Sequence, residues 1–305
     1  MLVRPTRAFP GTMFMLRGSA LSHIWLPLVA VSANATALWV THEWMAAHKL
    51  TLTATPFSIL GVALSIFLGF RNNACYDRWW EARKLWGLLI NRSRIVARQV
   101  LTLADTSPET HRELVYRQIA FVHALRLHLR EQLDRLDELV PFLGVEEVAR
   151  LRTEGNVPNA VLHTTGERVR DLWKAGQIDT FHLPVVEASL TVLADIQGGC
   201  ERIKNTPVPL AYTILTHRIV GLYCVTLPLG LLDTVGVLTP VVVAIVSFAF
   251  LGLDSVGTQI EDPFEEDPND LPLHAISRMI EVDLRQRLGE TDLPPRLKPV
   301  DGVLL

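Results

Sequence analysis

An uncharged stretch from Pro56 to Phe70, followed at once by Arg71, restricts the fold of this chain more than any other feature. Its side chains are either bulky and apolar or very small. A helix that is apolar on every face must be buried in protein or in lipid. At 1.5 Å per residue it spans about 22 Å, less than the ~30 Å hydrocarbon core of a bilayer. We therefore expect it to cross a membrane in contact with other helices.

Three bulky residues of this stretch, Val62, Ile66 and Phe70, are spaced four residues apart and share one helix face. Any packed helix shows such a stripe, so one interpretation is an ordinary core contact. The other is that symmetry copies of the helix surround an axis. Their stripes would then form a narrow apolar throat of the kind that gates by dewetting.

Composition separates a membrane part from a water-exposed part of the chain. Hydrophobic residues make up 49% of the 305 residues, while charged residues still make up 20%. The net charge of −3 gives no sign of a nucleic-acid partner. The three cysteines form no CxxC pair, and no HExxH, GxSxG or phosphate-binding loop occurs. We therefore expect no enzyme activity, no required cofactor and no assigned metal site.

The chain is expected to divide into five segments. Residues 1–20 form a cytosolic arm, and residues 21–70 hold transmembrane helices 1 and 2. Residues 71–206 form a cytosolic helical region, and residues 207–256 hold transmembrane helices 3 and 4. Residues 257–305 form an acidic loop and a cytosolic tail. No β alternation stands out, so the predicted class is an all-α membrane protein.

Basic residues set the expected orientation. They are frequent in the N-terminal arm and the central region but scarce in the link at Lys49 and the turn at Asp233. The positive-inside rule therefore places both termini in the cytosol, in a multi-pass protein of the cell (inner) membrane. His217 and Arg218 interrupt the third segment, and we expect this helix to enter lipid only near Ile219.

Helix signals mark the central region. Apolar periodicity after Arg71 predicts that the second segment continues as a long helix into solvent. Ser107 as N-cap and Pro108 at the first helical position predict a helix that runs to about Val140. Further helices are expected over 145–153, 159–175 and 184–204.

The stretch PFSILGVALSIFLGFRNNA, with the following RWWEARKLWG, resembles the second transmembrane segment of the bestrophins, specifically of their prokaryotic branch. The resemblance covers most of the chain, and it implies a homopentameric ion channel around a central pore. It implies a pore neck lined by Val62, Ile66 and Phe70. It also implies a second narrowing at the cytosolic exit, at Phe181, which by itself would be an ordinary helix-start anchor. Further anchors are Cys200-Glu201-Arg202-Ile203, Thr206-Pro207-Val208-Pro209 and Asp262-Pro263-Phe264.

The acidic stretch 259–270 follows the fourth transmembrane segment, where animal bestrophins carry a calcium clasp. Asp267 and Asp270 match two of the clasp acids, and Asp262 matches the Asn of the Asn-Pro-Phe in those relatives. Oxygen ligands at this density can hold Ca²⁺. Pro268 and Asn269, however, interrupt what is an unbroken acidic run in those relatives. We therefore favour a solvated acidic loop, with calcium binding as the alternative.

The residues give little basis for predicting which ions the channel selects, because the side chains of the apolar neck carry no charge. Arg71, Asn72 and Asn73 directly follow the neck, and an Arg71 that pointed into the pore would attract anions. Animal bestrophins pass chloride, whereas the prokaryotic branch that this chain resembles is associated with monovalent cations. The negative net charge also favours cations. We expect Na⁺ or K⁺ permeation, with a chloride channel of the same architecture as the alternative.

Two more remote alternatives are a transporter and a membrane scaffold. A transporter is expected to place ionisable residues at mid-membrane depth, for which only His217-Arg218 is a candidate. A scaffold would contact membrane lipids and a protein partner but pass no current.

Overall fold

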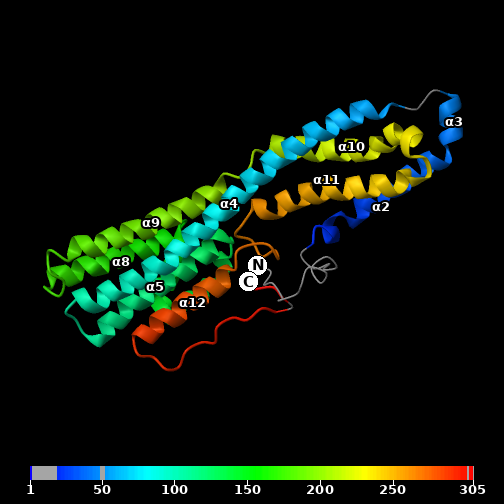
Figure 1. Cartoon of the computed structure of the whole chain (residues 1–305). Coiled ribbons are helices and arrows are strands. Elements are labelled where there is room, and N and C mark those ends of the chain that lie inside the picture. The colour runs from blue at the N-terminus through cyan, green and yellow to red at the C-terminus, as the bar shows by residue number, and fades with distance from the viewer. Residues whose placement is uncertain (2–18, 49–51, 301, 305) are drawn as a thin grey trace. The chain divides into compact units, whose positions relative to one another are not determined.

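The computed structural model describes residues 1, 19–48, 52–300 and 302–304 (Figure 1). Within these residues the chain is helical, and its only β pairings are two isolated bridges. This confirms the predicted all-α class. The chain divides into two units, which are described separately. The apolar unit comprises Arg4–Trp79 and Pro207–Asp262, and the polar unit comprises Met1–Val3, Trp80–Thr206 and Pro263–Leu305.

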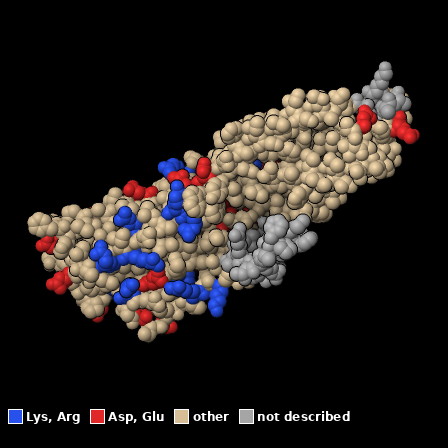
Figure 2. Space-filling model, in the orientation of Figure 1, with Lys and Arg blue, Asp and Glu red and all other residues tan. Residues whose placement is uncertain are grey.

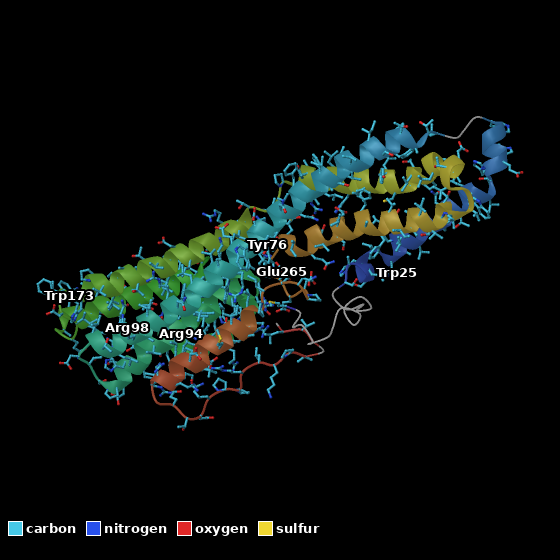
Figure 3. The ribbon with its side chains drawn as sticks, viewed as in Figure 1. Trp25, Tyr76, Arg94, Arg98, Trp173 and Glu265 are labelled. Atoms are coloured by element: carbon cyan, nitrogen blue, oxygen red, sulfur yellow. The ribbon has the colours of Figure 1, made fainter. Side chains whose placement is uncertain are left out.

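The apolar unit is built from α2 (Leu21–Val40), α3 (His42–Ala47), the first part of α4 (Ala54–Leu103), α10 (Leu210–Val235) and α11 (Thr239–Glu261). Helix α11 packs against both α2 and α10. The buried core includes Val31, Leu64, Leu68, Val220 and Val243. The visible face of this unit is almost free of charged side chains (Figure 2). Large apolar groups are exposed on it, among them Trp25 (Figure 3) and Leu222.

Three stretches of the described chain are long and apolar enough to cross a membrane: Leu21–Val40, Ala54–Leu103 and Leu210–Glu261. The third consists of α10 and α11, which the short helix η2 (Gly236–Leu238) joins. At 1.5 Å per residue these two helices are about 39 and 35 Å long, so each alone exceeds the ~30 Å hydrocarbon core.

Helix α4 runs without a break for 50 residues. Its one proline, Pro56, lies in the first turn, where a missing backbone N–H removes no helical hydrogen bond. This confirms that the second segment continues as a long helix. Along the chain, the boundary between the units falls between Trp79 and Trp80 within α4, nine residues beyond the expected boundary at Phe70. A further boundary falls between Asp262 and Pro263.

The polar unit surrounds α5 (Pro108–Leu129), which packs against α8 (Val157–Lys174), α9 (Leu183–Asn205) and α12 (Leu273–Arg287). The shorter elements η1 (Leu133–Leu139), α6 (Val140–Leu143) and α7 (Val145–Leu151) follow α5. Helix α5 begins as predicted, because the Thr110 backbone N–H donates to the Ser107 hydroxyl at 3.3 Å. Charged side chains of both signs cover this unit (Figure 2).

Helix α5 ends at Leu129, so the prediction that it runs to about Val140 is wrong. Glu131 adopts a positive φ of 56°, which terminates the helix. The backbone N–H of Gln132 donates to the Leu127 carbonyl and that of Glu131 to the His128 carbonyl. These two bonds form a Schellman motif, which satisfies carbonyls at the helix end.

Candidate functional site

The predicted neck residues lie on a free face of α4. Val62, Ile66 and Phe70 are 63%, 56% and 65% exposed in the single chain. At about 100° per residue the three side chains fall within about 80° of the helix circumference. Leu64 and Leu68, which are buried, point roughly to the opposite side. The stripe is therefore not an intramolecular core contact, and it is free to line an axis between subunits.

The opposite face of α4 is held by close contacts within the subunit. A Cβ atom at Gly61 would lie 2.7 Å from the Tyr223 hydroxyl. A Cβ atom at Gly230 on α10 would lie 2.2 Å from the ring of Phe57. Small residues are thus required where α4 approaches α10, as expected for helices that pack in a membrane. A Cβ atom at Gly69, in contrast, would meet none of the described neighbouring residues within 4 Å, so this position is open in the single chain.

Arg71 is buried directly after the stripe, with 1% of its surface exposed. Its Nη1 donates to Asp254 Oδ1 at 2.7 Å, and its Nη2 donates to Thr258 Oγ1 at 3.0 Å. Glu261 Oε2 lies 3.4 Å from the same Nη2. The condition for Arg71 to act as a pore charge is not met within the single chain, because its guanidinium turns toward α11 and pairs there with Asp254 and Glu261.

Asn72 also turns toward α11. Its Nδ2 donates to the Leu253 carbonyl at 2.9 Å, and a Cβ atom at Gly257 would lie 2.3 Å from its Oδ1. Asn73 is exposed. Of the three polar residues after the neck, only Asn73 thus keeps a free polar side chain in the single subunit.

Asp254 is a buried acidic residue that the sequence analysis did not single out. It lies between Arg71 and His217, whose Nε2 is 3.2 Å from Asp254 Oδ2. The available signal was a single acidic residue inside an otherwise uncharged helix, since an ionisable group in such a segment needs a partner.

Phe181 lies in the turn between α8 and α9 and is 86% exposed. The Asp179 side chain holds the turn by accepting a hydrogen bond from the Phe181 backbone N–H at 2.7 Å. An ordinary helix-start anchor would be buried against its helix, and Phe181 is not. Its ring is free to meet other copies of the chain.

The predicted clasp acids have different environments. Asp262, in the apolar unit, is exposed and lies 3.9 Å from Arg78. Asp267 and Asp270, in the polar unit, contact each other, as the Asp267 backbone N–H donates to Asp270 Oδ2 at 2.7 Å. Asp270 is buried, and burial raises the pKa of its carboxyl to about 7.

The loop is therefore only partly solvated, which corrects the expectation. Glu265, labelled in Figure 3, pairs with Lys204, and Glu266 pairs with Arg130 at 3.1 Å. No group of three or more His, Cys, Asp or Glu side chains within the described residues is placed to hold a metal ion.

Comparison with known proteins identifies the family. The family model described as bacterial and fungal bestrophin protein matches residues 1–286. The chain is 36% identical to a voltage-dependent anion channel-forming protein of Mesorhizobium japonicum, over 99% of this chain and 96% of that protein. It is 38% identical to the voltage-dependent anion channel-forming protein YneE of Escherichia coli, over 98% of both chains.

Solved structures agree with the sequence relatives. The crystal structure of a bacterial bestrophin homologue from Klebsiella pneumoniae superposes with a TM-score of 0.85 at 34% identity, over 89% of this chain and 100% of that chain. The matches to the family model, the curated relatives and the solved structure each span most of the chain. The protein belongs to the bestrophin family.

Proposed function

We propose that this protein is a homopentameric ion channel of the cell membrane that passes monovalent ions down their gradient. Four transmembrane helices per subunit, α2, the first part of α4, α10 and α11, surround the pore, and both termini lie in the cytosol. The neck is lined by Val62, Ile66 and Phe70. The observation that carries this proposal is the exposed apolar stripe opposite the packed face of α4.

Alanine substitutions test the neck. Truncating Val62, Ile66 or Phe70 widens an apolar constriction and makes it easier to wet, so single-channel current in lipid bilayers should rise. The control is Leu222→Ala, which removes a side chain of similar exposure from α10, outside the stripe. Unchanged current in all three neck variants would reject the assignment of this stripe as the neck.

The pentamer is tested by mass measurement of the purified protein in detergent. A particle of five chains is the expected result, and a monomer or dimer as the only species would contradict it.

The second narrowing is tested by Phe181→Ala. Because the ring is 86% exposed in the single chain, removing it should raise conductance without changing the oligomer.

We further propose that the permeant ions are monovalent cations. The net charge of −3 per chain gives the assembly an acidic field, which decays over a Debye length of about 8 Å in physiological salt. The one cation adjacent to the neck, Arg71, is neutralised by Asp254 and Glu261. The alternative is an anion channel, which the names of the relatives favour.

The reversal potential decides between the two. Purified protein in a planar bilayer under a KCl gradient should give a reversal potential near the potassium equilibrium potential. A shift toward the chloride equilibrium potential would reverse the assignment of ion sign and leave the channel assignment intact.

Calcium independence is the last part of this proposal. Micromolar Ca²⁺ should leave open probability unchanged, because Glu265 and Glu266 are occupied by basic partners and Asp270 is buried. A steep calcium dependence that Asp267→Ala and Asp270→Ala abolish would overturn it.

A further inference from the structure

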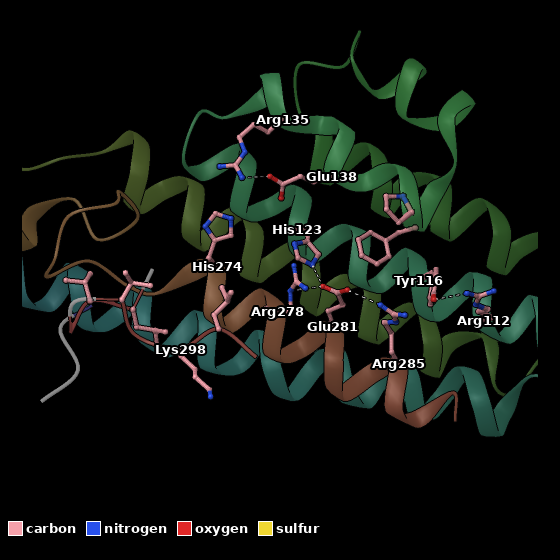
Figure 4. A pocket seen from close by; sticks show the side chains of 16 residues that line it. Arg112, Tyr116, His123, Arg135, Glu138, His274, Arg278, Glu281, Arg285 and Lys298 are labelled. Carbon is pink, nitrogen blue, oxygen red and sulfur yellow. Dashed lines mark hydrogen bonds and ion pairs between the residues drawn. The ribbon is translucent and has the colours of Figure 1, made fainter. Parts of the chain in front are cut away.

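A cavity of about 840 Å³ lies within the polar unit, between α5, α6, α12 and the C-terminal tail (Figure 4). Its volume falls in the range of small-molecule sites, roughly 300–1,000 Å³. The proposed ion pathway uses none of its residues. Five basic side chains line it: Arg112, Arg135, Arg278, Arg285 and Lys298.

Among the described residues that line the cavity, two carry carboxylates, Glu138 and Glu281. Glu281 is shared, because Arg278 Nε lies 3.3 Å from its Oε2 and Arg285 Nη1 lies 3.4 Å from its Oε1 (Figure 4). Glu138 is shared in the same way by Arg135, at 2.6 Å, and Arg126.

Glu290, which lies beside the cavity, takes up part of the charge of Arg112 and Arg285. Lys298 forms no ion pair with the described residues. Among the described side chains around the cavity, basic groups therefore outnumber carboxylates.

Two histidines, His123 and His274, also lie in the wall. Burial, together with the nearby Arg126 and Arg130, lowers the pKa of His274 to about 4. Burial is also the main cause of the lowered pKa of His123, to which Arg126 and Arg278 contribute. His123 is 5% exposed, and its Nε2 lies 3.3 Å from Glu281 Oε2.

The rest of the wall is apolar. Phe142 stacks on His123 with ring centroids 5.5 Å apart and meets Tyr116 edge-on at 5.7 Å. The tail contributes Leu297, Val300 and Leu304. A ligand that satisfies both parts of the wall needs a negatively charged group and an apolar body.

We propose that this cavity binds a small organic anion, with a phosphate or carboxylate held on the arginine-lined side and an apolar body between Phe142 and the tail. Arginine holds such groups through paired, charge-assisted hydrogen bonds. The site lies outside the residues assigned to the pore, so it does not depend on the proposed conduction.

Three matched probes test the proposal by calorimetric titration of the full-length protein in detergent: phenyl phosphate, inorganic phosphate and phenol. Phenyl phosphate carries both the charge and the apolar body, so it should bind at least about ten-fold tighter than either of the others. Equal affinity for phenyl phosphate and inorganic phosphate would overturn the proposal, as would no detectable binding of phenyl phosphate at millimolar concentration.

Variants then locate the binding. Arg278→Gln and Lys298→Gln should each weaken phenyl phosphate binding by about ten-fold, the usual effect of losing one charged contact. Arg170→Gln on α8 is the control, because Arg170 is an exposed arginine outside the cavity, paired with Asp171. Phe142→Leu should weaken phenyl phosphate but not inorganic phosphate. An equal loss of phenyl phosphate affinity in Arg170→Gln, or no loss in either Arg278→Gln or Lys298→Gln, would refute this location of the site. Lys298 is exposed on the tail, so its variant is expected to fold.

Discussion

Breaking the ion pair between Arg71 and Asp254 should destabilise the subunit strongly. Arg71 is 1% exposed, and its shortest contact is the 2.7 Å bond from Nη1 to Asp254 Oδ1. Removing one partner of a buried pair leaves an uncompensated charge, which costs about 3–5 kcal/mol. In Asp254→Leu, Glu261 remains 3.4 Å from the guanidinium. We therefore expect a loss near the lower end, about 3 kcal/mol.

The reverse substitution, Arg71→Met, should cost more, because it leaves both Asp254 and Glu261 without their buried partner. In the double variant Arg71→Met/Asp254→Leu the pair is replaced by apolar side chains, which is often close to neutral. Glu261 is still stranded there, so recovery is incomplete. The loss of unfolding free energy in the double variant should nevertheless be smaller than the sum of the two single losses, by at least about 2 kcal/mol.

Unfolding of the purified protein by SDS titration, followed by tryptophan fluorescence, measures these free energies. The control is Asp233→Leu, which breaks the exposed pair between Asp233 and His42 at the other end of the unit. An exposed pair contributes about 0–1 kcal/mol. Additive single effects, or a control loss as large as that of Asp254→Leu, would refute the reasoning that burial makes the Arg71 pair important.

Three further predictions concern single residues. The folded-state pKa of Asp270, about 7, lies above its ordinary value of 3.8. The stability that this carboxyl contributes is therefore complete below pH 3.8 and is lost as the pH rises through 7. Asp270→Asn should raise the melting temperature at pH 8 and have little effect at pH 4. Burial raises the pKa of Cys200 to about 12, so iodoacetamide at pH 8 should label it only after unfolding, as mass spectrometry of the digest would show. Gly257→Ala should cost about 1–3 kcal/mol in the same SDS titration, because the new methyl group would lie 2.3 Å from Asn72 Oδ1 and displace that side chain from the Leu253 carbonyl.

Local signals account for the parts of the fold that the sequence predicted well. Helix α8 ends within one residue of the expected position, because Gly176 supplies the positive φ of 73° that a helix end favours. Helix α5 ends in the same type of motif, but Glu131 occupies the left-handed position. Unlike glycine, glutamate in the sequence does not indicate a helix end, so the predicted helix extended to about Val140.

The sequence by itself determined which α4 residues share a face, because spacing along a helix depends only on its period. That Val62, Ile66 and Phe70 are free while Leu64 and Leu68 are buried was decided by the packing of α4 against α10 and α11. The direction of Arg71 was likewise decided by tertiary structure, since its partner Asp254 is 183 residues away. The cavity joins residues from Arg112 to Leu304. Contacts at such separations exist only after the helices have packed, and no local pattern of residues encodes them.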